Sequence, residues 1–243
     1  MDRATAAGVI EEAGLALTDA GRAAPDAPVP SCPGWTVSTV VKHVGLVHTW
    51  AADMLRTYPT EPLAFPKAPP EVTPDELPDW ADTQRDGLVR AVRDSDGDRE
   101  MWAFGRVRPA SFWWRRQAIE TSIHSWDATN AVSTPFEIPA SVGVAGIEEL
   151  LDGLLARKFA GEPPLWGTGR TIHFHRTDGD GDGEWLLRID DPPEVTLGHA
   201  KGDLAVRGPA AELLLWATNR RSSGVELFGD ERLAAGWAAN VRI

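Results

Sequence analysis

The sequence predicts a two-domain α+β protein, in which a four-helix bundle is followed by a small α/β domain with a mainly antiparallel sheet. The first half has apolar residues at the spacing of α-helices, whereas short alternating runs separated by Gly, Asp and Pro clusters follow Arg170. The chain has 243 residues, 42% of them hydrophobic and 25% charged, which is enough for two globular cores. We expect the bundle over residues 1–160 and the second domain over residues 161–243.

Four long helical segments make up the expected bundle. They cover residues 3–21, 36–57, 74–94 and 109–132. Thr36 or Ser38 is a suitable N-cap for the second helix, and Thr73 followed by Pro74 is typical of the start of the third. A short irregular or extended stretch, residues 101–107, precedes the fourth. Proline-rich segments between the first three helices predict long loops.

The second domain is expected to contain short strands and helices. A fifth helix, opened by Pro139, leads toward it over residues 140–159. The expected strands cover residues 171–177, 184–190, 195–198, 203–208 and 225–230, and the expected helices cover residues 209–221 and 231–241. We expect these strands to pair mainly as an antiparallel meander.

The composition excludes several classes of function. The formal net charge of −12 disfavours nucleic acid as a partner and favours a small-molecule substrate. No apolar run reaches the roughly 18 residues of a membrane span. The N-terminal segment carries acidic residues where a secretory signal has a basic start, so we expect a cytoplasmic protein. Because Cys32 is the only cysteine, a metal must use nitrogen and oxygen ligands. The oligomeric state stays open.

Three side chains from two distant segments are candidate ligands of such a metal. Glu120 and His124 are four residues apart, which places both on one face of a helix. On the second helix His43 is flanked by valines at helical spacing and is expected to point inward, whereas His48 is expected near the surface. A core histidine satisfied by a hydrogen bond is the alternative for His43. Two imidazoles and one carboxylate suit a divalent transition metal, zinc most simply, and leave a coordination position open.

These motifs carry a resemblance to a known family. SCPGWTVSTVVKHVGLVHTWAA, residues 31–52, together with RRQAIETSIHSWDA, residues 115–128, resembles the mycothiol-dependent maleylpyruvate isomerase family, whose N-terminal part is a DinB-like metal-binding bundle. LLLWATNRRSSGVELFGD, residues 213–230, is similar to the C-terminal α/β domain of that family. The resemblance implies a zinc site formed by His43, Glu120 and His124. It also implies mycothiol as the thiol cofactor.

The resemblance further implies an arginine of the second domain beside the thiol or an acidic substrate. The motif falls on Arg220, with the adjacent Arg221 as the alternative. A guanidinium group suits this role because its planar fork pairs with a carboxylate through two hydrogen bonds. Arginine at a solvated helix end, where it favours the carbonyl dipoles, is the structural alternative.

Several functions remain compatible with these residues. The resemblance favours a mycothiol-dependent isomerase acting on a small acidic or electrophilic substrate. The alternatives are a mycothiol S-transferase, a metal-dependent hydrolase and a non-enzymatic small-molecule binding protein. His173 and His175 alternate along an expected strand and face one side, but no carboxylate or cysteine lies at a persuasive spacing, so we interpret them as strand-surface residues. His199 has no informative context.

Overall fold

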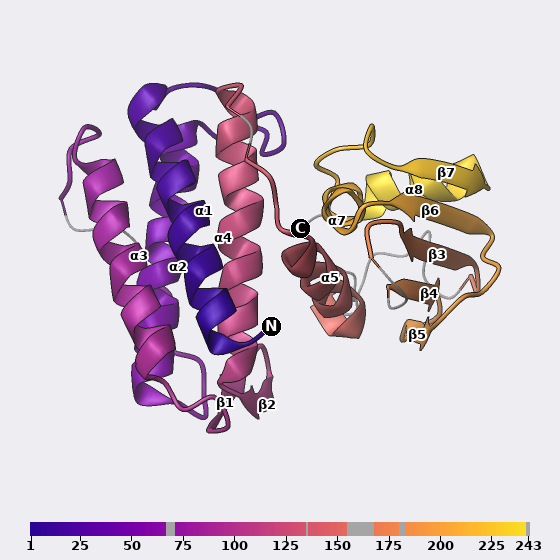
Figure 1. Ribbon diagram of the computed structural model, residues 1–243, viewed down its shortest axis with the longest axis horizontal. Coiled ribbons are helices and arrows are strands. Elements are labelled where there is room, and N and C mark those ends of the chain that lie inside the picture. Colours follow the sequence, from indigo (N-terminus) through magenta and orange to yellow (C-terminus); the bar gives the residue numbers. More distant parts are fainter. Residues whose placement is uncertain (67–70, 135, 155–167, 180–182, 242–243) are drawn as a thin grey trace. The chain divides into compact units, whose positions relative to one another are not determined.

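The computed structural model describes residues 1–66, 71–134, 136–154, 168–179 and 183–241. These residues form two compact units, Met1–Ile138 and Pro139–Ile243 (Figure 1). The first unit is helical and the second contains a five-stranded sheet, so the predicted fold class is confirmed. The two units divide between Ile138 and Pro139, whereas the domain boundary was expected at residue 160, which lies outside the described residues.

The first unit is a bundle of four helices. They are α1 (Arg3–Ala23), α2 (Val37–Thr57), α3 (Leu77–Asp94) and α4 (Ser111–Ala131). Helix α1 packs against α3 and α4, and α2 also packs against α3 and α4 (Figure 1). None of the helices in the described part of the chain is long and apolar enough to cross a bilayer.

The start of α2 matches the sequence expectation and the start of α3 does not. Thr36 is the N-cap of α2, and its side chain and that of Thr39 form a reciprocal capping box. Thr73 does not cap α3. Its amide and hydroxyl instead donate to the Glu76 carboxylate, which closes a turn, and α3 begins at Leu77. The predicted helix start at Pro74 is therefore three residues too early.

A short hairpin connects α3 to α4. Strand β1 (Glu100–Ala103) pairs antiparallel with β2 (Arg106–Pro109), where the sequence indicated only an irregular or extended stretch. Phe104 and Gly105 form the turn with positive φ angles of 49° and 82°. The Trp50 and Trp113 rings, 5.1 Å apart, pack near this hairpin in a cluster of aromatic side chains. These tryptophans therefore belong to the core rather than to a ligand pocket.

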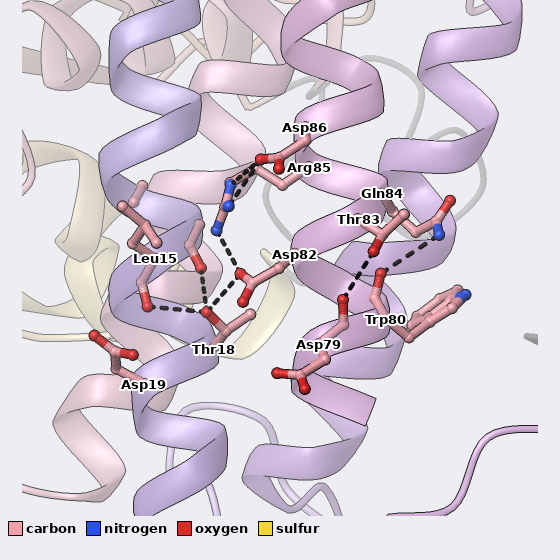
Figure 2. A network of polar contacts seen from close by, with 12 residues as sticks. Leu15, Thr18, Asp19, Asp79, Trp80, Asp82, Thr83, Gln84, Arg85 and Asp86 are labelled. Atoms are coloured by element: carbon pink, nitrogen blue, oxygen red, sulfur yellow. Dashed lines mark hydrogen bonds and ion pairs between the residues drawn. The ribbon is translucent and has the colours of Figure 1, made fainter. Parts of the chain in front are cut away.

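A polar network joins α1 to α3 in the first unit, as Figure 2 shows. The Thr18 hydroxyl on α1 donates to Asp82 on α3 at 2.9 Å. Arg85 is only 7% exposed and pairs with Asp82 and, at 2.8 Å, with Asp86. Gly14 provides the space for it, because a Cβ atom at this position would overlap the Arg85 side chain. The network therefore fixes the contact between two helices that pack closely.

The second unit is built around the sheet. Its strands are β3 (Thr171–Arg176), β4 (Glu184–Arg188), β5 (Glu194–Leu197), β6 (Leu204–Gly208) and β7 (Glu226–Gly229), in the spatial order β5-β4-β3-β6-β7. Strands β3, β4 and β5 form the expected meander. Strand β3 pairs with β6 in parallel, however, so the sheet is mixed and mostly antiparallel.

Among the residues of this unit that the structure describes, three helices accompany the sheet. They are α5 (Ala140–Glu149), continued by a π-helical turn (Leu150–Leu154), α7 (Ala210–Ala217) and α8 (Glu231–Asn240). Phe174 of β3 is fully buried and contacts the rings of Trp216 on α7 and Trp237 on α8. The helices α7 and α8 therefore cover the face of the sheet that carries Phe174, and His173 and His175 project to the opposite face.

We expect Gly143→Ala to destabilise the second unit by about 1–3 kcal/mol, the usual cost of overpacking a core. Helix α5 packs on α7, and a Cβ atom at Gly143 would lie 2.6 Å from both the Ala210 carbonyl oxygen and the Ala211 nitrogen. Backbone atoms cannot move aside as a side chain can, so the two helices must separate. Chemical denaturation of the full chain measures the loss.

Gly8→Ala is the matched control, because a Cβ atom at this helical glycine meets nothing within 4 Å. Removing a helical glycine there should leave stability unchanged or raise it slightly. Equal stabilities of the Gly143→Ala and Gly8→Ala variants would contradict the close approach of α5 and α7.

Candidate metal centre

The structure brings His43, Glu120 and His124 together in the first unit. His43 lies in the second turn of α2, whereas Glu120 lies at the middle of α4 and His124 one turn later. The His43 Nε2 atom is 3.2 Å from Glu120 Oε1, and the His124 Nε2 atom is 3.4 Å from the same oxygen. One donor atom from each residue lies within 4.8 Å of the others. The two distant sequence segments therefore converge on one point.

Local structure accounts for this convergence. The capping box at Thr36 sets where α2 begins, which fixes the direction of His43 two turns later. Glu120 and His124 are preorganised by their spacing on α4. Contacts at both ends, His43 with Glu120 and Trp50 with Trp113, show that α2 and α4 run antiparallel.

The spacing of the donor atoms fits a tetrahedral metal ion. Two donors that each lie about 2.0–2.1 Å from zinc at a tetrahedral angle are about 3.3 Å apart. The observed separations of 3.2 and 3.4 Å between the imidazole nitrogens and Glu120 Oε1 bracket this value. Three protein donors also leave one tetrahedral position for an external ligand. The residues present therefore fit a divalent metal.

A second carboxylate orients His124. The Nδ1 atom of His124 lies 2.9 Å from Asp127 Oδ2, and Asp127 is fully buried. Ser31 donates to the other Asp127 oxygen at 2.6 Å, and the Cys32 thiol lies 3.6 Å from Oδ2. A carboxylate that accepts the Nδ1 proton leaves Nε2 as the donor atom, an arrangement common for histidines that bind metals. Asp127 was not among the site residues predicted from the sequence, although its position three residues after His124 on a helix was a usable signal.

The charges of the group favour a bound cation. Burial raises the pKa of Glu120, but the Arg116 guanidinium and His124 outweigh it and hold this pKa well below its usual range. Burial also lowers the pKa of His124, but the charge of Glu120 and the hydrogen bond to Asp127 raise it well above its usual value. Without a metal, the raised pKa therefore favours a doubly protonated His124, with Nδ1 facing Asp127 and the additional proton on Nε2 facing Glu120. A metal ion would replace that proton.

Cys32, His124 and Asp127 form a second candidate donor set that shares His124. A metal there would have to use the Nδ1 side of the imidazole. Asp127 already accepts from Ser31 and from His124 on that side. We therefore interpret this set as the support of His124 and the His43 group as the candidate metal centre.

Aromatic rings and solvent border the group on different sides. The Trp35 ring is stacked 6.3 Å from the His124 ring and lies 5.2 Å from that of His43. The His43 side chain is 31% exposed, against 13% for Glu120 and 11% for His124. In this unit a small molecule would therefore approach from the His43 side, with Trp35 as an apolar wall.

His48 is not part of the group and is not near the surface, contrary to the expectation from the sequence. It is 1% exposed, and its Nε2 atom lies 2.9 Å from the Thr121 hydroxyl oxygen. That hydroxyl donates to the Gln117 carbonyl, so Nε2 of His48 carries the proton and Nδ1 is an unprotonated acceptor. Burial lowers the pKa of His48 to about 3, which keeps it neutral.

Arg220 and Arg221 lie in the second unit, just after α7. They line a cavity of about 390 Å³ together with Trp216 and Trp237. An Arg220 Nη atom donates to the Thr218 carbonyl at 3.2 Å, whereas Arg221 pairs with Glu212 at 3.2 Å. Both arginines therefore border a pocket in the part of the chain where the resemblance places a binding role.

Comparison with known families covers both units. The family model described as "Mycothiol maleylpyruvate isomerase N-terminal domain" matches residues 7–129, and the "MDMPI C-terminal domain" model matches residues 141–236. The chain belongs to the mycothiol-dependent maleylpyruvate isomerase family. This confirms the resemblance of the sequence motifs, and both the His43 group and Arg220 lie within the matched ranges of this family member.

Two solved structures share the fold of this family member. The crystal structure of the mycothiol-dependent maleylpyruvate isomerase superimposes with a TM-score of 0.66 at 17% identity over 93% of both chains. A mutant of that enzyme, with a histidine replaced by alanine, gives a TM-score of 0.65 at 16% identity over 93% of both chains. No curated protein matches the sequence. At such identities the structural similarity establishes the fold alone.

We expect Asp127→Asn to weaken metal binding by about 10–100-fold, the usual effect of losing the carboxylate that orients a histidine ligand. The amide oxygen is a weaker acceptor for the Nδ1 proton than the carboxylate. The His124 ring is therefore held less firmly, and its Nε2 atom becomes less basic. Zinc titration against a chromophoric chelator measures the affinity. Ser31→Ala, which removes only a donor to Asp127, is the control and should have a much smaller effect. Equal affinities of the Asp127→Asn variant and the wild type would contradict the support role of Asp127.

Proposed function

We propose that this family member is a metal- and mycothiol-dependent enzyme of the maleylpyruvate isomerase type, acting in the cytoplasm on a small acidic or electrophilic molecule. The observation that carries the proposal is the convergence of His43, Glu120 and His124 at separations suited to zinc, with one side open. Membership of the family supports mycothiol as the thiol and isomerisation as the reaction class.

In this proposal some residues of the chain bind the metal and others orient or ionise the ligands. His43 Nε2, Glu120 Oε1 and His124 Nε2 would hold the ion. Asp127 keeps the Nε2 lone pair of His124 available, and Arg116 keeps Glu120 ionised. A divalent metal bound here would lower the pKa of a coordinated thiol, so that a thiolate exists at neutral pH.

The reaction needs no nucleophile from the protein. Mycothiol would supply reversible thiolate addition to the cis double bond of maleylpyruvate, rotation about the resulting single bond and elimination to fumarylpyruvate. Trp35 would exclude water from one side of the site, which strengthens the electrostatic contacts inside it. Arg220 would bind a carboxylate of the substrate or of the thiol, with Arg221 as the alternative.

The decisive experiment omits one component at a time. Purified chain is incubated with zinc, mycothiol and maleylpyruvate, and fumarylpyruvate formation is followed. Turnover that requires both zinc and the thiol supports the proposal. A stable mycothiol adduct of an electrophile would indicate a transferase instead, and turnover without thiol a hydrolase. Substrate binding that chelators do not affect, without turnover, would indicate a binding protein.

We expect Arg220→Met to lower kcat/KM by about 10–100-fold, because a hydrogen-bonded contact to a charged group contributes about 1.5–3 kcal/mol. Methionine retains much of the side-chain volume but removes the charge. Steady-state kinetics with the acidic substrate measure the change, and Arg220→Lys should recover part of it.

Arg221→Met is the matched variant for this prediction. Arg221 pairs with Glu212, so its replacement should affect stability more than substrate binding. A larger loss of kcat/KM in the Arg221→Met variant would assign the binding role to Arg221. Unchanged kinetics in both variants would remove the arginine from the proposal.

A further inference from the structure

A second cluster of metal-ligating side chains lies in the second unit. It consists of His173 and His175 on β3, Glu184 on β4 and His199 just after β5. Glu184 is at the centre of it. Its carboxylate oxygens lie 3.2 Å from His173 Nε2, 3.1 Å from His175 Nδ1 and 2.7 Å from His199 Nδ1. One donor atom from each of the four residues lies within 4.8 Å of the others.

The sheet brings these residues together from three separate segments. His173 and His175 are two apart on β3 and so share one face. His175 lies directly opposite Glu184 in the antiparallel β3–β4 register, which puts the carboxylate on the same face. Gly198, with a φ angle of 104°, follows β5, and its amide donates to the Glu184 carbonyl. This glycine turns the chain so that His199 reaches Glu184.

The cluster contains a buried polar atom that has no hydrogen-bond partner. The His173 side chain is only 4% exposed, and its Nε2 atom points at the Glu184 carboxylate without hydrogen-bond geometry. His199 has the shortest contact with Glu184 and forms a well-aligned hydrogen bond with it, whereas His173 and His175 contact the carboxylate at 3.2 and 3.1 Å. A buried and unsatisfied nitrogen costs about 1–3 kcal/mol unless another ligand satisfies it. A cation bound between Glu184 and the three imidazoles would serve as the missing partner of His173 Nε2.

We propose that His173, His175, Glu184 and His199 form a second metal site, selective for a divalent transition-metal ion such as Zn²⁺. Three imidazoles and one carboxylate are a donor set that zinc accepts. Four protein donors fill a tetrahedral coordination sphere, which is the arrangement of structural rather than catalytic zinc sites. The bound ion would tie the segment after β5 to the two strands β3 and β4. It would act independently of the His43 group.

The cluster is also accessible to an ion from solution. Glu184 and His199 line a cavity of about 510 Å³, together with Glu148 of α5. The His199 side chain is 80% exposed, whereas those of Glu184 and His173 are 20% and 4% exposed. His199 can therefore turn away to admit the ion and return to complete the coordination. A purely hydrogen-bonded cluster would explain the His199 contact but leaves the buried His173 nitrogen unsatisfied.

The test counts metal ions in full-length, untagged protein, because a histidine tag would itself bind metal. A His43→Ala/His124→Ala chain removes the first group and leaves the second. After chelator treatment and dialysis against Zn²⁺, elemental analysis should find one equivalent in this chain. Adding His175→Ala or His199→Ala should lower the zinc affinity of that equivalent by at least roughly tenfold. Glu194→Gln, which changes an exposed carboxylate on β5, is the matched control and should retain it.

A second measurement guards against misfolded variants. His199 is exposed, so His199→Ala should keep the circular dichroism spectrum of its parent. In the His43→Ala/His124→Ala background, Zn²⁺ should raise the Tm of the chain, and His199→Ala should abolish that rise. The proposal is overturned if the His43→Ala/His124→Ala chain binds no zinc. It is equally overturned if neither His175→Ala nor His199→Ala lowers the zinc affinity of that chain.

Discussion

His43→Ala and His124→Ala are each expected to remove the metal from the first unit and to lower kcat/KM by about 10³-fold or more. A bound metal contributes several kcal/mol of charge stabilisation to the reactions that it assists. Each imidazole supplies one of only three protein donors, so a single loss leaves an incomplete coordination sphere. Elemental analysis and the fumarylpyruvate assay measure the two effects on the same samples.

The two variants are expected to differ in their stability. His124→Ala also leaves Asp127 buried without the imidazole that it contacts, so this variant should lose stability as well. His43 is partly exposed, and His43→Ala should fold normally. Lys42→Ala, at the exposed neighbouring position on α2, is the control and should keep both metal and activity. Retention of the first-unit metal by both histidine variants would contradict the site.

The stability of the first unit should fall as the pH decreases from about 6.5, because His48 stays neutral in the folded chain. Its folded pKa of about 3 lies below the ordinary histidine value of 6.5, so the unfolded chain binds more protons between these values. The contribution of His48 is therefore complete above pH 6.5 and is lost toward pH 3. Each pH unit in this window corresponds to about 1.4 kcal/mol, which gives about 4–5 kcal/mol over the whole window.

His48→Leu tests this pH dependence against the wild type. Leucine fills the buried position without a titratable group, although it loses the contact with Thr121. Urea unfolding at a series of pH values between 6.5 and 5 should give a steeper loss for the wild type than for the variant. This range avoids most carboxylate titration, and the difference between the two chains cancels the contributions of other groups. Parallel stability curves would show that His48 titrates normally in the folded chain.

The bundle and its candidate metal centre were largely predictable from the sequence. Helical spacing places Glu120 and His124 on one face, and the Thr36 cap sets the start of α2. That His43 meets them depends on helix packing, which spacing alone does not reveal. The family motif supplied this link. The same limitation explains His48, whose contact with Thr121 on another helix makes a buried position acceptable for an imidazole.

Other features depend on contacts between distant residues that sequence patterns do not encode. The late start of α3 follows from the Glu76 side chain, which accepts two hydrogen bonds from Thr73. The parallel β3–β6 pair was not predicted, because alternation of apolar residues gives the face of a strand and not its neighbour. The second histidine cluster was missed because Glu184 belongs to a different strand and His199 arrives through a glycine turn.

The mixed pairing of the sheet determines the order in which the second unit can assemble. Strands β3, β4 and β5 are neighbours both along the chain and in space, so they can pair early at low entropic cost. The parallel partner β6 must close a much larger loop and should join later. All four donor residues of the cluster around Glu184 lie on or directly after these three strands, so pairing of β3, β4 and β5 alone would bring them together. An ion captured at that stage would act as a folding nucleus for the remaining strands.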